Sequence, residues 1–92
     1  MNLTIDIGNT NIMICIFKNN QIIKHEKVNV INFSKKDQYN FFKKLFFKYK
    51  ISNILMSSVV PKISDSFSEI FKKLKVDYLH IKNLLNICKL KT

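Results

Sequence analysis

The sequence predicts an α/β fold in which helices pack on a mixed sheet. The first third of the chain alternates strand signals with turn signals, and the remainder alternates helical and strand signals. Hydrophobic residues make up 47% and charged residues 24% of the 92 residues, which is the balance of a small globular domain. No internal repeat or low-complexity linker divides the chain, so we expect one continuous unit.

The first three elements are predicted to be strands joined by short turns. Leu3 to Ile7 is a short apolar strand, and Asn11 to Lys18 is an Ile-rich strand of the kind that is buried on both faces. Asn19 and Asn20 form a two-residue break that tolerates positive φ. Gln21 to Val28 is therefore predicted to return antiparallel, as a hairpin partner.

A helix is predicted next. Ser34 precedes Asp37 by three residues, which is a start similar to a capping box. Apolar residues then recur at spacings of three and four, as on one face of an amphipathic helix: Tyr39, Phe42, Leu45, Phe46 and Tyr49.

Asn53 to Ser58 is predicted to be a compact apolar strand that ends before Val59, Val60 and Pro61. Proline is well suited to the first position of a helix. The second helix is predicted to run through about Leu74, with one apolar face made of Ile63, Phe67, Ile70, Phe71 and Leu74.

Val76 to Ile81 is predicted to be the last strand, and the tail from Asn83 fits either a helix or a frayed end. The order is therefore β-β-β-α-β-α-β. Antiparallel strands come first, and helical crossovers then favour parallel pairing. This order suits a ribonuclease H-like half domain, as in the superfamily of acetate and sugar kinases, chaperone ATPases and actin, although many small α/β domains share it.

The formal net charge is +10, which raises nucleic acid or another polyanion as a partner. All 16 cations are lysine, and Ile, Lys and Asn together supply 41 of the 92 residues. This bias fits an A/T-rich coding sequence that places lysine on solvated surface, and a dedicated nucleic-acid binder would use some arginine. Nucleic acid is therefore not expected as a partner, and a lysine-rich nucleic-acid or anion-binding module is kept as the alternative.

Isolated cysteines and histidines give no sign of a metal or redox site. Cys15 and Cys88 lie far apart and outside any CxxC pair, so neither a disulfide framework nor a zinc site is expected. His25 and His80 have no nearby Asp or Cys partner.

No apolar run approaches the roughly 18 residues that span a bilayer, and no signal peptide precedes the first strand. We expect a soluble cytoplasmic protein without a membrane partner.

Gly8, the only glycine, lies between the first two predicted strands. The hexapeptide around it consists of Asp6, Ile7, Gly8, Asn9, Thr10 and Asn11. A glycine here would allow positive φ and would let a phosphate approach without meeting a Cβ. The amide, hydroxyl and backbone N–H groups that follow offer donors to an anion, and Asp6 can hold Mg²⁺. The pattern predicts a turn that binds the phosphates of ATP.

An ordinary hairpin turn is the alternative for residues 8–11, because Gly, Asn and Thr are common turn residues and Asp can cap a turn. The complete hexapeptide at the first turn of a strand-led α/β chain favours the phosphate-binding interpretation.

The segment from Leu3 to Ile12 closely resembles the opening of type III pantothenate kinases. Ser57 to Pro61, with the sequence Ser-Ser-Val-Val-Pro, resembles a segment that this family has after its first helix, and we assign it a structural role. The resemblance extends over nearly all of this chain and about the first third of the enzyme. It implies that residues 1–92 are a truncated N-terminal ATP-binding lobe, with the second lobe absent.

The resemblance implies ATP-dependent phosphorylation of pantothenate to 4'-phosphopantothenate, the first step of coenzyme A biosynthesis. It also implies a homodimer that requires Mg²⁺ and a monovalent cation, K⁺ or NH₄⁺. Asp6 is the expected metal ligand. The residues expected to bind ATP are Asp6, Ile7, Gly8, Asn9, Thr10, Asn11, Ile12 and Met13.

In this family the downstream half contains a Gly-x-Asp-Arg segment, which binds pantothenate and supplies the catalytic aspartate, and a second phosphate turn of Asp-x-Gly-Thr type. This chain has no arginine and no second glycine. Asp65, Glu69 and Asp77 lack the context of a catalytic base and are expected to be surface charges. We therefore assign no catalytic residue and expect no catalysis by the chain alone; a non-functional structural remnant is a further alternative.

Overall fold

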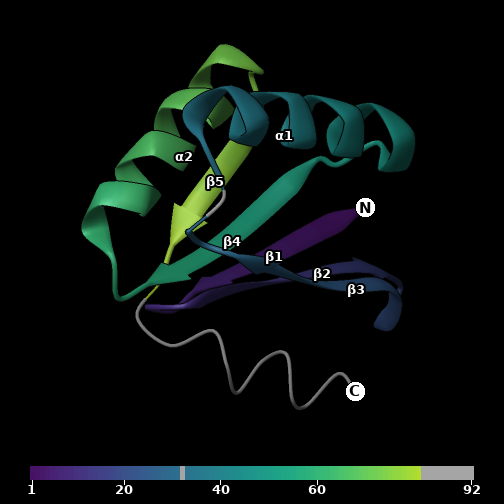
Figure 1. Ribbon diagram of the computed structural model, residues 1–92. Coiled ribbons are helices and arrows are strands. Elements are labelled where there is room, and N and C mark those ends of the chain that lie inside the picture. Colours follow the sequence, from purple (N-terminus) through teal and green to yellow (C-terminus); the bar gives the residue numbers. More distant parts are fainter. Residues whose placement is uncertain (32, 82–92) are drawn as a thin grey trace.

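The computed structural model describes residues 1–31 and 33–81, and it confirms the predicted α/β class and element order. The predicted tail from Asn83 lies outside the described residues. Figure 1 shows both helices on one face of the sheet. The elements are β1 (Asn2–Ile7), β2 (Asn11–Lys18), β3 (Gln21–Asn29), α1 (Lys35–Tyr49), β4 (Asn53–Ser58), α2 (Pro61–Lys73) and β5 (Asp77–His80).

The five strands form one mixed sheet in the order β3-β2-β1-β4-β5. β1 pairs antiparallel with β2, which pairs antiparallel with β3. β1 pairs parallel with β4, and β4 pairs parallel with β5. The helical crossovers α1 and α2 account for this change from antiparallel to parallel pairing. β1 is therefore the central strand, and its carboxyl end lies between the start of β2 and the end of β4.

The turn between β2 and β3 has the predicted conformation. Asn19 has a φ of 51° and Asn20 a φ of 68°. Lys18 pairs with Gln21, so Asn19 and Asn20 form the whole loop. Asparagine tolerates left-handed backbone better than most residues, which explains why this loop forms without glycine.

Both helices begin where the sequence predicts. The Ser34 hydroxyl accepts a hydrogen bond of 3.2 Å from the Asp37 backbone N–H and caps α1. Pro61 opens α2. Just before it, the Ser58 hydroxyl accepts from the Val60 N–H at 2.9 Å and donates to the Val60 carbonyl at 3.0 Å. These two bonds fix the backbone that leads from β4 into α2.

The core fills the space between the sheet and the helices. Alternate residues of β1 and β2 face the helices and are fully buried there. The helices contribute Phe42, Phe67 and Phe71. The Phe42 ring meets the other two edge-on, with its centroid 4.9 Å from Phe67 and 5.1 Å from Phe71. Burying each such side chain stabilises the fold by about 1.5–3 kcal/mol. The sheet residues of this core are Leu3, Ile5, Ile7, Ile12, Ile14, Ile16, Ile54 and Met56.

Candidate functional site

A tight turn joins β1 to β2 at the carboxyl end of the central strand. Ile7 pairs with Ile12 across the hairpin, and the Gly8 N–H donates a 2.9 Å hydrogen bond to the Asn11 carbonyl. The predicted phosphate turn is thus a closed hairpin loop. In open α/β sheets, ligands bind beyond the carboxyl ends of parallel strands, and this turn lies at that edge.

Gly8 does not have the left-handed conformation that we predicted, because no glycine of the chain has a positive φ. The reason for glycine here is contact. A Cβ placed on Gly8 would lie 3.1 Å from the Asn11 carbonyl oxygen, closer than side chains normally tolerate. The hydrogen bond that closes the turn brings these two backbone segments together. The prediction of positive φ at Gly8 was therefore wrong, and glycine is favoured here by the tight contact.

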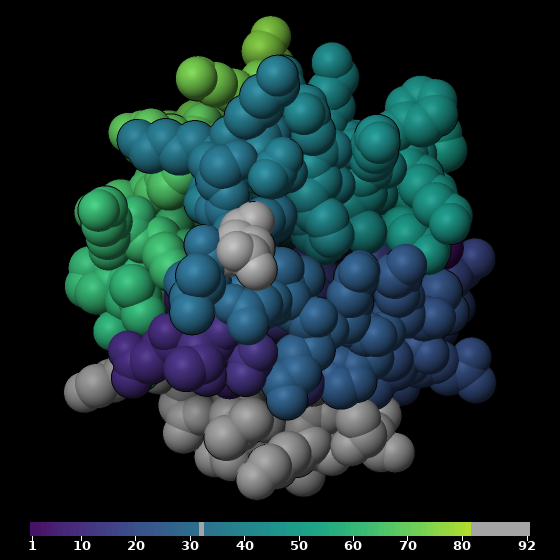
Figure 2. Space-filling view, in the orientation of Figure 1, coloured from purple at the N-terminus to yellow at the C-terminus, as the bar shows by residue number. Residues whose placement is uncertain are grey.

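Neighbouring segments hold the turn from two sides. The Val30 N–H, just after β3, donates to the Thr10 carbonyl at 3.0 Å. The Val59 N–H, just after β4, donates to the Ile7 carbonyl at 3.0 Å. Figure 2 shows the purple turn at the surface, bordered by the green start of α2 and the blue connection between β3 and α1. The backbone of the turn is therefore fixed before any ligand arrives.

The side chains of the predicted ATP-binding residues separate into two groups. Ile7 and Ile12 are fully buried in the core, so they can offer a ligand only backbone groups. Asn9 and Thr10 are exposed at the tip, and the Asn11 side-chain amide donates to the Thr10 hydroxyl at 3.2 Å. The exposed tip therefore carries amide, hydroxyl and backbone donors, which is the chemistry that an anion requires.

Asp6 lies next to the turn, on the face of the sheet away from the helices. In the strand register it lies opposite Met13 on β2 and Ser57 on β4. Its side chain is half-buried, and burial raises the pKa of the Asp6 carboxyl above its ordinary value of 3.8. Among residues 1–31 and 33–81 the ion pair is between Lys24 and Glu26. No positively charged group in this part of the chain therefore pairs with Asp6. A partly desolvated carboxylate of this kind favours a bound cation.

The described side chains alone could not complete the coordination of a divalent cation at Asp6. Among the described residues no three His, Cys, Asp or Glu side chains lie close enough together to hold a metal ion. Mg²⁺ is commonly held by one or two carboxylates together with substrate phosphates and water. Asp6 beside a turn rich in anion-binding groups fits that arrangement.

The three carboxylates of the second half of the chain lie on the surface, as expected. Asp65 and Glu69 are exposed on α2, and Asp77 is exposed at the start of β5. His25 and His80 are exposed on β3 and β5. Cys15 is buried in β2, and Cys88 lies outside the described residues. No helix in the described part of the chain has the length and apolar character of a membrane span.

A pocket that the sequence did not predict lies between the starts of the two helices. It has a volume of about 320 Å³. Two lysines line it from segments that are far apart in sequence, so no local pattern could have identified the pair. The residues that line this helix-start pocket are Ile12, Val30, Phe33, Lys35, Gln38, Lys62, Ile63 and Ser66.

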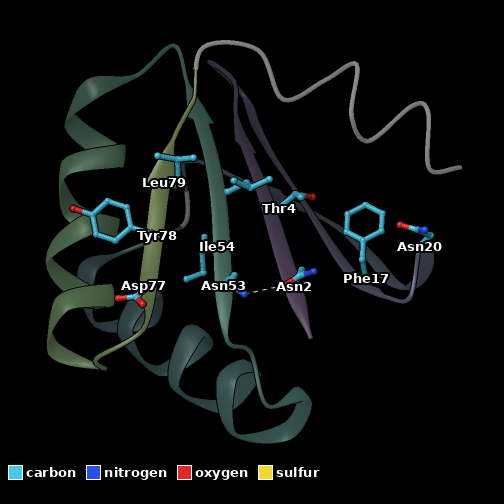
Figure 3. A pocket seen from close by; sticks show the side chains of 10 residues that line it. Asn2, Thr4, Phe17, Asn20, Asn53, Ile54, Asp77, Tyr78 and Leu79 are labelled. Atoms are coloured by element: carbon cyan, nitrogen blue, oxygen red, sulfur yellow. Dashed lines mark hydrogen bonds between the residues drawn. The ribbon is translucent and has the colours of Figure 1, made fainter.

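A second cavity, of about 460 Å³, lies away from the turn. Asn2, Asn53 and Asp77 line it and begin β1, β4 and β5, so it belongs to the amino ends of these parallel strands. Figure 3 shows Phe17 and Asn20 on its other side, and the Asn53 side chain donates to Asn2 at 3.4 Å. The amino ends are the opposite edge from Asp6, so this cavity is separate from the candidate site.

Comparisons with known sequences agree on one family. The family model described as type III pantothenate kinase matches residues 2–91. A type III pantothenate kinase of Desulforapulum autotrophicum is 35% identical, over 96% of this chain and 38% of the relative. One of Borreliella burgdorferi is 36% identical, over 86% of this chain and 30% of the relative. The chain therefore spans about a third of the length of these relatives.

A comparison with solved structures supports the fold. A crystal structure from Bacteroides thetaiotaomicron, described as a protein with an actin-like ATPase fold and unknown function, superposes with a TM-score of 0.67. The match covers 98% of this chain and 36% of that one, at 9% sequence identity. This likeness is consistent with the predicted ribonuclease H-like half domain.

Proposed function

This chain belongs to the type III pantothenate kinase family, and from that premise we propose that residues 1–92 are the N-terminal ATP-binding lobe of an enzyme that phosphorylates pantothenate. The product is 4'-phosphopantothenate, and the reaction begins coenzyme A biosynthesis. The observation that carries the proposal is the position of Asp6 directly before a fixed turn of anion-binding groups. Its carboxylate is half-buried and forms no ion pair within residues 1–31 and 33–81.

In this proposal the turn binds the phosphates of ATP. Asn9, Thr10 and Asn11 provide hydroxyl, amide and backbone N–H donors, and Gly8 keeps the backbone close enough to close the loop. Because Val30 and Val59 already hold the turn, binding requires little reorganisation of its backbone. Phosphoryl transfer depends mainly on such positioning and on charge stabilisation.

Asp6 would hold the Mg²⁺ that accompanies ATP. The bound ion would neutralise charge on the phosphates. The Asp6 carboxylate serves this role because it lies at the end of a rigid central strand and because partial burial makes its negative charge costly without a cation. Ile12 and Met13 continue the site into β2, where Ile12 supplies only backbone because its side chain is in the core.

We assign no catalytic base to this chain. Its remaining carboxylates on α2 and β5 are exposed and lie outside the turn. The chain spans 38% and 30% of the length of two curated relatives, and the groups that complete the reaction are proposed to come from the rest of such an enzyme. On the family resemblance alone we extend the proposal to a monovalent cation, K⁺ or NH₄⁺, and to a cytoplasmic homodimer.

A coupled assay of ATP consumption with pantothenate tests the assignment of the catalytic base. The chain is expected to show no turnover above an Asp6→Ala variant, because it provides phosphate positioning without a base. Turnover well above that variant would place the base within residues 1–92 and contradict this part of the proposal.

A polyanion-binding module is the second candidate, and the distribution of charge favours it over the remnant hypothesis. The helical layer, defined as residues 34–50 and 61–75, contains three acidic residues, Asp37, Asp65 and Glu69. It also contains ten lysines: Lys35, Lys36, Lys43, Lys44, Lys48, Lys50, Lys62, Lys72, Lys73 and Lys75. This candidate predicts binding to generic DNA that weakens steeply with salt and survives Asp6→Ala. Loss of DNA binding in that variant would exclude it.

A further inference from the structure

A buried serine, Ser57, lies beside Asp6 on the sheet. β1 pairs parallel with β4, and in this register Asp6 lies directly opposite Ser57. Met56 belongs to the core between the sheet and the helices, so Ser57 faces the other side of the sheet, as Asp6 does. Ser57 is only 7% exposed, and Asp6 is half-buried. A hydroxyl and a carboxylate therefore stand next to each other on one face.

The two serines at the end of β4 have different surroundings. The Ser58 hydroxyl accepts from the Val60 N–H at 2.9 Å and donates to the Val60 carbonyl at 3.0 Å, so it serves the connection into α2. Successive residues of a strand point to opposite faces, so Ser57 points away from that connection. The structural role that we assigned to the segment from Ser57 to Pro61 thus explains the serine at position 58 and does not account for the one at position 57.

The other close neighbours of Asp6 on this face suit a hard cation less well. Met13 lies opposite Asp6 on β2, and its thioether sulfur is a soft ligand that does not suit Mg²⁺. Thr4, two residues earlier on β1, is buried further from the carboxyl edge and donates its hydroxyl to the Cys15 carbonyl at 3.5 Å. Of these three neighbours, Ser57 is the one that offers a side-chain oxygen at the carboxyl edge.

A carboxylate next to a hydroxyl is a donor set that Mg²⁺ accepts. In P-loop NTPases the ion is held by an aspartate together with a serine or threonine hydroxyl. Adjacent strands lie about 4.8 Å apart, and neighbouring ligands of an octahedral Mg²⁺ lie about 3 Å apart. Two short side chains on paired strands can therefore reach one ion. A hydroxyl has two acceptor lone pairs and one donor hydrogen, so it can bind an ion and still donate a hydrogen bond.

The position of Ser57 is fixed relative to the phosphate turn. The Val59 N–H donates to the Ile7 carbonyl at 3.0 Å, which extends the contact between β4 and β1 beyond Ser57 to the residue just before Gly8. Little backbone freedom is then lost when the end of β4 binds a ligand. An ion between Asp6 and Ser57 would lie at the edge of the sheet where the turn offers its donors to phosphates.

We propose that the Ser57 hydroxyl is the second protein ligand of the divalent cation that Asp6 holds. Its Oγ would take one coordination position beside the Asp6 carboxylate, and substrate phosphates and water would take the others. The inference rests on the proposed function, because it concerns the cation that accompanies ATP. It gives a binding role to a residue that the sequence indicated only as part of a structural segment.

Calorimetric titration of the whole chain with ATP and Mg²⁺ tests this inference, and ATP with EDTA is titrated separately. Ser57→Ala is expected to weaken the binding of Mg-ATP about tenfold and to leave the binding of metal-free ATP unchanged. The matched control is Ser64→Ala, which removes another buried serine hydroxyl, from α2 on the other side of the sheet, and should leave both affinities unchanged. Circular dichroism under the same conditions checks that each variant is folded.

A thiol at position 57 gives a readout that a purely structural role would not change. Ser57→Cys keeps the size of the side chain and replaces a hard oxygen with a soft sulfur, which favours Cd²⁺ over Mg²⁺. Compared with wild type, this variant should bind Cd-ATP more tightly and Mg-ATP more weakly, with new thiolate-to-cadmium absorbance. The wild type controls for Cys15 and Cys88. Adding Asp6→Ala to Ser57→Cys should abolish the gain, since both residues are proposed to hold one ion.

The other outcomes separate the inference from the proposed function. Equal Mg-ATP affinity in wild type, Ser57→Ala and Ser64→Ala, with loss of binding in Asp6→Ala, would overturn the inference and leave the proposed ATP site standing. Weaker binding of metal-free ATP by Ser57→Ala would assign the hydroxyl to the phosphates and would also overturn it. So would a gain in Cd²⁺ binding that persists without Asp6. Absence of Mg-ATP binding by the wild type would contradict the proposed function itself, and the inference with it.

Discussion

The backbone nitrogen of Gly8 lies 2.9 Å from the carbonyl oxygen of Asn11, and a Cβ on Gly8 would lie 3.1 Å from the same oxygen. One backbone group therefore both closes the turn and leaves little room for a side chain at position 8. Glycine is favoured at position 8 because of this contact and not because of a left-handed backbone.

Gly8→Ala is expected to destabilise the fold by about 1 kcal/mol, because the Cβ must push the Asn11 carbonyl away from its hydrogen bond. Gly8→Asn should cost at least as much, since the tolerance of asparagine for positive φ brings no benefit here. Chemical denaturation of both variants measures the difference. Rescue by asparagine relative to alanine would show that the backbone at position 8 is left-handed after all.

Asp6→Asn is expected to make the fold more stable at neutral pH. Burial raises the pKa of the Asp6 carboxyl in the folded chain above 3.8, so between 3.8 and the raised value the folded chain binds more protons than the unfolded chain. Wild-type stability therefore falls as pH rises through this window, whereas the amide does not titrate.

Denaturation curves across this pH range test the sign. The advantage of Asp6→Asn should vanish below pH 3.8, where both states of the wild type are protonated. Asp65→Asn, at an exposed position on α2, is the control and should show no comparable gain. A wild type that is more stable than Asp6→Asn at neutral pH without Mg²⁺ would contradict the account.

Ser58→Ala should destabilise the connection from β4 to α2. The variant loses one bond from the Val60 N–H and one to the Val60 carbonyl, each worth about 0.5–1.5 kcal/mol. Ser68→Ala on α2 is the matched control, since no hydrogen bond involves that side chain within the described part of the chain. Equal unfolding free energies for the two variants would mean that these bonds do not hold the segment.

Lys62→Met is expected to stabilise α2 by about 0.3–1 kcal/mol in the absence of ligand, because it removes a cation from the first turn of the helix. Lys72→Met, in the last turn, should have the opposite effect for the same reason. Thermal unfolding at low salt measures both changes. Destabilisation by Lys62→Met would contradict this account and show that the Lys62 side chain supports the fold.

Local sequence signals predicted most of the fold. β2 and β4 have the predicted bounds, because turn residues and charged residues stand at their ends. β5 is shorter than predicted. Lys75 is left-handed and the Val76 N–H donates to the Phe71 carbonyl, so Val76 belongs to the end of the preceding helix and not to the sheet.

The parts of the site that the sequence could not predict depend on tertiary contacts. The backbone angle of Gly8 follows from the position of the Asn11 carbonyl across the turn, which no sequence pattern encodes. Lys35 and Lys62 lie near each other only because both crossover helices start at the same edge of the sheet. Local chemistry predicted Asp6 and the turn as the candidate site, whereas the proximity of the two lysines follows from the arrangement of the helices.

The most direct test is calorimetric titration of the chain with ATP in the presence of Mg²⁺, using wild type, Asp6→Ala and the exposed control Asp65→Ala. The account predicts weak binding by wild type and by Asp65→Ala, since the proposed lobe would provide only one side of a cleft, and loss of that binding in Asp6→Ala. Equal affinity in all three proteins would contradict the assignment of the turn and Asp6 as the ATP site.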